Sequence, residues 1–221
     1  MTYVVPTILV KNEHEFRRRV AAIGTYFNRA QIDVLDNTFV PAESFRDVRA
    51  IEYIRGDLQY EIDLMTRIDG YDLAQWNKPW VDKIIIHVEA TAQADAVLKQ
   101  IRAWGKRAFL SVNPDTSFTA MERYLPNADG VLFMTVKPGR SGNLFQPQVL
   151  DAIQAFRKKH PTVEIEVDGG VTLETMQSLL SVGVNGFAVG SFLDNEKMEE
   201  HALELVAAIE QFEQKNQQRK R

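Results

Sequence analysis

The segment IEVDGGVT, residues 165–172, decides the fold of this chain. Its first residues form a short β-type run that ends on Asp168, and two glycines follow before a helical pattern begins near Thr172 or Leu173. Glycines let a backbone approach a ligand closely, and a helix N-terminus favours an anion. The segment therefore predicts a strand, a turn suited to an anion, and a helix.

Seven further β-type runs occur along the chain. They are continuously apolar rather than alternating, which is typical of parallel strands buried on both faces. Amphipathic helical patterns lie between the runs, and no change of composition marks a linker. The eight runs cover residues 4–10, 31–36, 59–64, 83–88, 107–112, 130–136, 163–168 and 186–190. The pattern predicts an α/β protein, a single (β/α)8 TIM barrel over residues 1–212.

An open doubly wound sheet is the structural alternative. Such a sheet usually carries its phosphate-binding glycines after the first strand, and residues 4–10 are not followed by such a turn. Residues 213–221 are polar and end in three basic residues, so we expect a frayed tail there.

Composition excludes several classes of protein. The chain has 221 residues, 45% of them hydrophobic, and a formal net charge of −4, which is typical of a globular domain and not of a nucleic-acid binder. It contains no cysteine, so disulfides, thiolate zinc sites and a cysteine nucleophile are excluded. No apolar run approaches eighteen residues and no signal-peptide pattern begins the chain, so we expect a cytoplasmic protein without a membrane partner.

Glycine-containing segments follow three neighbouring strands of the expected barrel. In such barrels the reactive groups lie at the carboxyl ends of the strands, and phosphate is often held after strands 7 and 8. Each segment could be a plain turn by itself, but three at one rim predict a phosphate site. The expected substrate-binding residues are Gly139, Arg140, Ser141, Gly142, Gly169, Gly170, Gly190 and Ser191.

Three aspartates lie within or at the end of apolar strands. Asp33 and Asp63 interrupt such runs, and Asp168 ends one. Aspartate is a poor strand former, and a buried unpaired carboxylate is costly, so these positions need a reason. They indicate a metal site, a catalytic acid/base pair, or both. The alternative is that each carboxylate only makes structural hydrogen bonds.

Taken together, these segments resemble the ribulose-phosphate 3-epimerase family. The match covers nearly the whole chain in order, so it is specific for the fold and superfamily and less specific for the reaction. It is carried by PTIL at 6–9, DVLD at 33–36, FVP at 39–41, DLM at 63–65, HVEA at 87–90, VNP at 112–114, MTV at 134–136, PG at 138–139, VDGGV at 167–171 and GS at 190–191.

The resemblance implies metal-assisted epimerisation of a ketose phosphate at the carbon adjacent to the ketone, from ribulose 5-phosphate to xylulose 5-phosphate or a close relative. It implies Asp33 and Asp168 as the acid/base pair, and Thr7 in place of a serine that contacts the substrate. Inversion needs a base and an acid on opposite faces, and the enediolate needs a positive charge, which a divalent metal supplies. A small phosphorylated sugar is the expected partner, and a homo-oligomer is possible because family members often associate.

The expected metal site departs from the family pattern. Family members hold the metal with two histidines and two aspartates, whereas Gln31 and Asp63 stand at the histidine positions here. A site rebuilt from Asp33, Asp63, Asp168 and the Gln31 carbonyl would favour Mg²⁺ or Mn²⁺ over Zn²⁺ or Fe²⁺. The other interpretation is that the metal is absent and the carboxylates raise one another's pKa. We favour the first, because Asp63 replaces one type of ligand by another.

The segment after the sixth strand carries two cations. Arg140 stands where the family usually has an aromatic residue, and it either binds an anionic group of the substrate or faces solvent. Lys137 suggests a Schiff base with a ketone, although its position at the start of a loop argues against this. The alternative functions are therefore a non-catalytic phosphosugar-binding homologue without the metal, and a related barrel lyase or aldolase.

Overall fold

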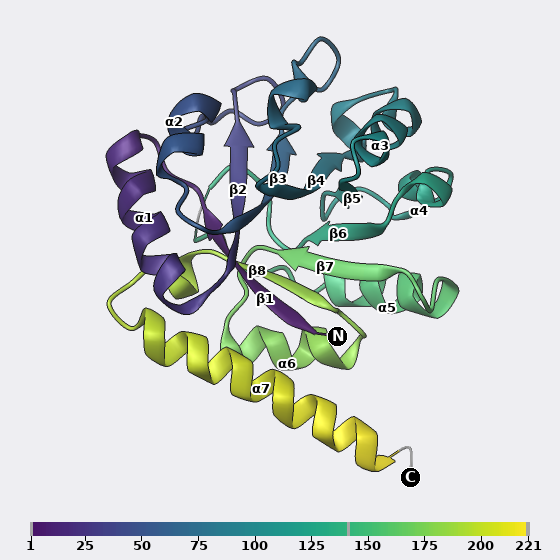
Figure 1. Cartoon of the computed structure of the whole chain (residues 1–221). Coiled ribbons are helices and arrows are strands. Elements are labelled where there is room, and N and C mark those ends of the chain that lie inside the picture. Colours follow the sequence, from purple (N-terminus) through teal and green to yellow (C-terminus); the bar gives the residue numbers. More distant parts are fainter. Residues whose placement is uncertain (1, 141, 220–221) are drawn as a thin grey trace.

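The computed structural model describes residues 2–140 and 142–219. Eight strands form one closed barrel, in which each strand pairs in parallel with the next and the last pairs with the first (Figure 1). The strands are β1 (Tyr3–Ile8), β2 (Arg29–Leu35), β3 (Gln59–Met65), β4 (Val81–His87), β5 (Arg107–Val112), β6 (Gly130–Met134), β7 (Glu164–Asp168) and β8 (Gly186–Val189). The closed barrel confirms the predicted fold and excludes the open sheet.

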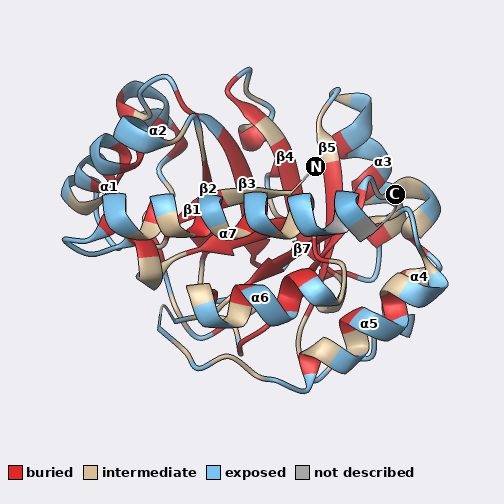
Figure 2. Ribbon diagram, turned by 90° about the horizontal axis from the view of Figure 1, so that it is seen from below, coloured by how far each residue is buried: buried red, intermediate tan, exposed pale blue. Residues whose placement is uncertain are grey.

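Helices surround the barrel and turn their buried faces toward it, as Figure 2 shows. The α-helices are α1 (Glu13–Tyr26), α2 (Val48–Ile54), α3 (Ala94–Ala103), α4 (Thr119–Glu122), α5 (Val149–Lys159), α6 (Leu173–Ser181) and α7 (Met198–Arg219). Short 3₁₀ turns are η1 (Leu73–Trp76), η2 (Val88–Ala90), η3 (Leu125–Asn127) and η4 (Ser191–Leu193). The connection from β3 to β4 has only η1, whereas the sequence pattern predicts a helix after each strand.

The start of α1 illustrates how the sequence fixes an element. The Asn12 side chain accepts a hydrogen bond from the Glu15 N–H at 2.9 Å, which satisfies one of the free N–H groups of the first turn. Phe16, Val20 and Ile23 then follow at helical spacing and are buried against the barrel. Burial of each such side chain contributes about 1.5–3 kcal/mol, so packing determines where the helix lies.

The barrel interior has a polar layer at each end and an apolar layer between them. Ile85, Phe109 and Leu132 belong to the apolar cluster inside the barrel. Toward the amino ends of the strands, Lys83 is fully buried and contacts both Glu61 and Glu166. Because β4 and β7 are not neighbours, the contact between Lys83 and Glu166 crosses the interior. The carboxyl ends of the strands hold the second polar layer, described below.

The last helix, α7, continues through residues 213–219 of the polar segment that the sequence predicts to be frayed. Its side chains Ala208 and Phe212 pack against the core, and the Glu213 carboxylate accepts a hydrogen bond from the Thr2 N–H at 3.2 Å. These contacts extend the helix beyond the apolar pattern.

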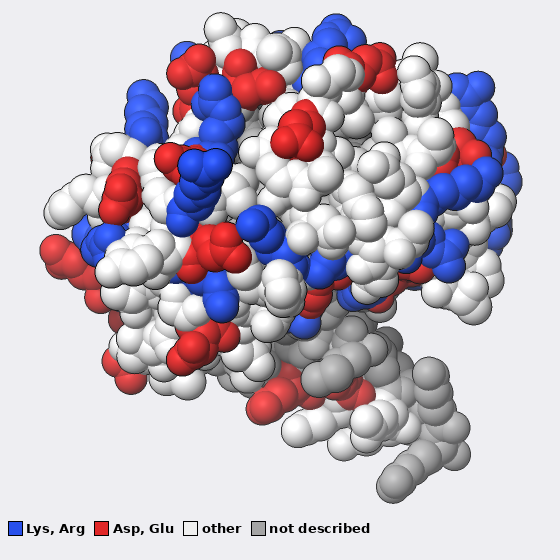
Figure 3. All heavy atoms as spheres, turned by 45° about the horizontal axis from the view of Figure 1, so that its top comes forward, with Lys and Arg blue, Asp and Glu red and all other residues white. Residues whose placement is uncertain are grey.

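Figure 3 shows acidic and basic side chains interspersed on the face in view. Among the described residues, no helix is long and apolar enough to cross a membrane.

Candidate active site

The carboxyl ends of three strands bring together the aspartates that the sequence singles out. Asp33 lies near the carboxyl end of β2, Asp63 lies beside it in register on β3, and Asp168 is the last residue of β7. One carboxylate oxygen from each lies within 4.8 Å of the others, and all three residues are buried. Strand position and register therefore create a compact acidic cluster at one end of the barrel.

Gln31 connects two of these carboxylates. Its side-chain amide nitrogen donates to Asp33 Oδ1 at 2.8 Å and to Asp168 Oδ2 at 2.7 Å. The residue is completely buried, and its Oε1 has no hydrogen-bond partner among the described residues. Gln31 thus holds Asp33 and Asp168 together across the barrel, because β2 and β7 are not neighbouring strands.

The third aspartate has a partner of its own. His87 Nε2 lies 3.2 Å from Asp63 Oδ1, and both side chains are fully buried. The His87 ring also lies against Phe39, with 5.2 Å between ring centroids. Sequence reasoning did not foresee this contact. The position of His87 in the HVEA motif does not show which side chain it meets, because that depends on the geometry of the barrel.

Burial and mutual repulsion control the protonation of the cluster. Burial, with the charges of Asp168 and Asp63, raises the pKa of Asp33 well above its ordinary value of 3.8. Burial and the charge of Asp63 raise the pKa of Asp168 to about 7. Burial lowers the pKa of His87, but the charge of Asp63 outweighs it, so the pKa of His87 lies above its ordinary value. Near neutral pH the cluster therefore retains protons in the absence of a cation.

The donor set of the cluster fits a hard divalent cation. Both carboxylate oxygens of Asp63 lack a hydrogen-bond donor of good geometry among the described residues, and so does the buried Oε1 of Gln31. Buried polar atoms normally have partners, so these oxygens are available to a ligand. Carboxylate and amide oxygens are the ligands that Mg²⁺ and Mn²⁺ prefer. Gln31 could supply its oxygen only after its side-chain amide flips, which exchanges the positions of Nε2 and Oε1.

Two glycines after β7 form a turn that only glycine fits. Gly169 has a φ of +108° and Gly170 a φ of +60°. A Cβ on Gly169 would lie 2.3 Å from Val136 Cγ2, and one on Gly170 would lie 2.9 Å from the Phe145 backbone nitrogen. The bare backbone leads directly into α6, whose first turn is capped by Thr172. This is the strand, turn and helix that residues 165–172 predict.

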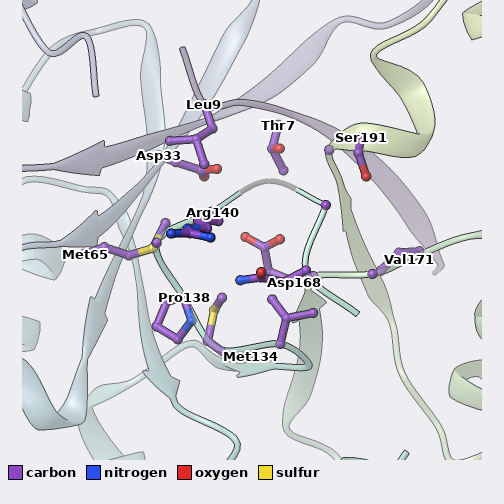
Figure 4. Close-up of a pocket in the computed structure, with 17 residues that line it drawn as sticks. Thr7, Leu9, Asp33, Met65, Met134, Pro138, Arg140, Asp168, Val171 and Ser191 are labelled. Atoms are coloured by element: carbon purple, nitrogen blue, oxygen red, sulfur yellow. The ribbon is translucent and has the colours of Figure 1, made fainter. Parts of the chain in front are cut away.

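A cavity of about 510 Å³, open mouth included, lies above the cluster of Asp33, Asp63 and Asp168, which we call the acidic floor (Figure 4). Gln31 and Asp63 are not part of the lining, but Gln31 donates hydrogen bonds to Asp33 and Asp168, which are. Of the predicted residues, the lining contains Thr7, Asp33, Gly139, Arg140, Gly142, Asp168, Gly169, Gly170, Gly190 and Ser191, while Ser141 lies outside the described residues. Sequence reasoning did not place Leu9, Val136 and Val171 in this lining.

The two cations after β6 lie at different places. In Figure 4 the Arg140 side chain lies beside Met65 and Asp33, on the other side of Asp168 from Ser191. Lys137 is exposed and does not line this cavity; it lines an adjoining hollow, which Arg140 lines as well. That position does not support a Schiff base at the cluster, since such a lysine must reach the bound ketone.

An eight-stranded parallel barrel with an acidic floor and a glycine-containing rim at the carboxyl ends of its strands belongs to the class of (β/α)8 barrel enzymes. A family model for the ribulose-phosphate 3 epimerase family matches residues 3–193. The chain belongs to this family and is placed with it among the isomerases that act on carbohydrate phosphates.

Individual relatives and solved structures agree with this assignment. Ribulose-phosphate 3-epimerase of Mycobacterium bovis is 30% identical over 196 residues, covering 85% of this chain and 84% of its own. The enzyme of the same name from Schizosaccharomyces pombe is 26% identical over 193 residues, covering 85% of each chain. A 3-keto-L-gulonate-6-phosphate decarboxylase structure from Vibrio cholerae superposes with a TM-score of 0.74 at 14% identity, covering 96% of this chain and 98% of its own. That likeness establishes a shared barrel fold.

Proposed function

We propose that this protein epimerises a ketose phosphate at the carbon adjacent to its ketone, with ribulose 5-phosphate and xylulose 5-phosphate as the substrate pair. One observation carries the proposal. Asp33 and Asp168 come from non-neighbouring strands, accept from one Gln31 amide at 2.8 and 2.7 Å, and both line the same cavity. Two carboxylates on different sides of one cavity are what inversion of a carbon centre needs.

The rim of the cavity would orient the substrate. The bare backbone at Gly169 and Gly170, the start of α6, and Gly190 with Ser191 suit a phosphate dianion. With the phosphate held there, the sugar would extend over the floor toward Asp33 and Met65. The carbon next to the ketone would then lie between the two aspartates.

The two aspartates would exchange roles between the forward and reverse reactions. An ionised carboxylate removes the proton from the carbon adjacent to the ketone, and the protonated one returns a proton from the opposite face. In the cation-free site the pKa of Asp168 lies at about 7, so this carboxyl holds or releases a proton near neutrality. In the cation-free site the Gln31 amide orients both carboxylates.

A divalent cation would complete the site. Asp33, Asp63 and Asp168 would hold it, with Gln31 as a fourth ligand once its amide turns over, and Mg²⁺ or Mn²⁺ fit these oxygens best. When bound, the cation supplies positive charge to the enediolate oxygens. The buried oxygens of Asp63 that lack donors support this role.

The test is proton exchange in D₂O. The purified protein is incubated with ribulose 5-phosphate and with Mg²⁺, Mn²⁺, Fe²⁺ or Zn²⁺ in turn, and deuterium at C3 is followed by NMR. We expect exchange with Mg²⁺ or Mn²⁺, and its loss in Asp168→Asn, which keeps the shape but not the base. Saturable binding of the sugar phosphate without exchange under any metal would instead favour a non-catalytic phosphosugar-binding protein.

A further inference from the structure

Arg19 is a buried cation on the apolar face of α1. Only 3% of its surface is exposed, and it lies one helical turn from Phe16 and Ile23. A buried charge is costly unless it is paired and hydrogen-bonded. Among the described residues its one ion-pair partner is Asp194, whose Oδ1 lies 3.4 Å from Arg19 Nη1 and whose side chain is 47% exposed. The guanidinium must therefore be satisfied mainly by other groups.

Three backbone carbonyls satisfy it. Nη1 donates to the Leu193 oxygen at 2.6 Å, and Nε and Nη2 both donate to the Thr7 oxygen at 3.3 Å. Nη2 also lies 3.5 Å from the Gly190 oxygen. Thr7 belongs to β1, whereas Gly190 and Leu193 follow β8. Arg19 thus joins the two strand ends where the barrel closes.

These carbonyls belong to the backbone behind the cavity. The Gly190 oxygen and the Ser191 N–H belong to one planar peptide group and point in opposite directions. The Gly190 oxygen accepts from Arg19 and from the Leu193 N–H at 3.0 Å. The Ser191 N–H therefore points away from Arg19, and it has no acceptor within the part of the chain that the structure describes. Gly190, Ser191 and Thr7 all line the cavity (Figure 4).

We propose that Arg19 is a positioning residue for the phosphate subsite. It fixes the Gly190 peptide so that the Ser191 N–H is free for a phosphate oxygen. It also holds Thr7 of β1 at the other side of the same subsite. Its charge lies directly behind this backbone and favours a dianion in front of it. This inference rests on the proposed function, because it concerns the subsite that would hold the substrate's phosphate.

The test measures anion binding and catalysis in Arg19→Met and Arg19→Lys. We expect Arg19→Met to raise both the KM for ribulose 5-phosphate and the dissociation constant of inorganic phosphate about tenfold, with kcat changed far less. Arg19→Lys keeps the charge, but its single nitrogen cannot take the places of the three guanidinium nitrogens that contact these carbonyls, so it should have an intermediate effect. Phosphate binding is measured by calorimetry and does not depend on turnover.

Arg157 provides a matched control. Its guanidinium also donates to several carbonyls, among them those of Gly183 and Val163, but these precede β8 and β7 at the other end of the barrel. Arg157→Met should lower the melting temperature and leave KM and phosphate binding unchanged.

Each outcome separates the two proposals. If wild-type protein binds phosphate and Arg19→Met binds it equally well, Arg19 is merely structural and the inference is wrong. If wild-type protein binds neither inorganic phosphate nor the ketose phosphate, the proposed function is wrong, and the inference is wrong with it.

Discussion

The acidic floor should make the stability of the cation-free protein fall as pH rises. The pKa of Asp168 lies at about 7 in the folded protein, against an ordinary value of 3.8, because burial and Asp63 disfavour the charged form. A group with a raised folded-state pKa contributes stability that is fully present below the unfolded-state pKa. That contribution is lost as pH rises through the folded-state pKa.

The magnitude follows from the shift. With the pKa of Asp168 at about 7 in the folded protein and 3.8 in the unfolded chain, and 1.36 kcal/mol for a tenfold change in proton affinity, Asp168 alone removes about 4 kcal/mol of stability between pH 4 and pH 8. Asp33 shifts in the same direction and adds to the loss. A cation that binds the ionised cluster restores stability, because it binds the folded state and not the unfolded chain.

Asp63→Asn therefore has an unusual expected effect. The substitution keeps the shape of the side chain and removes the charge that, after burial, most raises the pKa of Asp168. The substitution also removes the buried contact with His87, so the comparison is the loss of stability between pH 5 and pH 8 and not the absolute stability. With EDTA we expect this loss to be smaller in the variant than in wild type by about 1–2 kcal/mol, part of the Asp168 contribution, which for a domain of this size is about 2–8 °C in Tm. Mn²⁺ should stabilise the variant less than wild type, because the variant has lost a ligand.

Differential scanning fluorimetry at pH 5 and pH 8, with EDTA or Mn²⁺, measures all four conditions. Asp36→Asn is the control, since Asp36 follows β2 but is outside the cluster. With EDTA, a loss of stability between pH 5 and pH 8 as large in Asp63→Asn as in wild type would refute the electrostatic reasoning. An equal Mn²⁺ effect in variant and wild type would refute Asp63 as a ligand.

Three further predictions concern the rest of the barrel. Lys83→Met leaves Glu61 and Glu166 buried without their cation, so we expect urea unfolding at pH 8 to show a loss of about 3–5 kcal/mol, largely recovered when both glutamates are also changed to glutamine. An undiminished unfolding free energy would contradict this. Gly170→Ala forces a Cβ against Phe145 at a φ of +60° and should lower stability by about 1–3 kcal/mol and weaken phosphate binding, both measurable by calorimetry. Arg140→Ala should raise KM about tenfold if the guanidinium contacts an anionic group of the substrate, and an unchanged KM would make it a solvent-facing cation.

The fold followed from the sequence because its signals are local. Continuous apolar runs, each followed by turn residues, predict buried parallel strands, and eight of them predict closure into a barrel. The helical structure of the polar tail was harder to predict, since Phe212 and Glu213 extend α7 through contacts with the barrel and not through contacts within the helix. The segment between β3 and β4 formed only a short 3₁₀ turn for a similar reason: tertiary packing of Trp76 and Trp80 replaces a helix there.

The candidate site was partly predictable. Asp33, Asp63 and Asp168 are unusual in apolar strands, so their shared position at the strand ends could be inferred. The contact between His87 and Asp63 could not, because it depends on which side chains meet inside the barrel. Arg19 did leave a signal: positions 16, 19, 20 and 23 follow the spacing of a buried helical face, and one of them is a cation.

The two replaced histidines differ in what they do to the charge of the site. Gln31 replaces a neutral ligand by another neutral group, whereas Asp63 adds a negative charge to a cluster that already contains Asp33 and Asp168. The structure places His87 3.2 Å from that added carboxylate, whose charge helps to raise the pKa of the imidazole above its ordinary value. Whenever the imidazole is protonated, its charge offsets the one that Asp63 adds, and a dication then meets the net charge of a site with two carboxylates. A buried histidine beside Asp63 is thus a means by which an oxygen-only cluster in this barrel can hold a hard cation without becoming more acidic than the histidine-containing arrangement that the family resemblance implies.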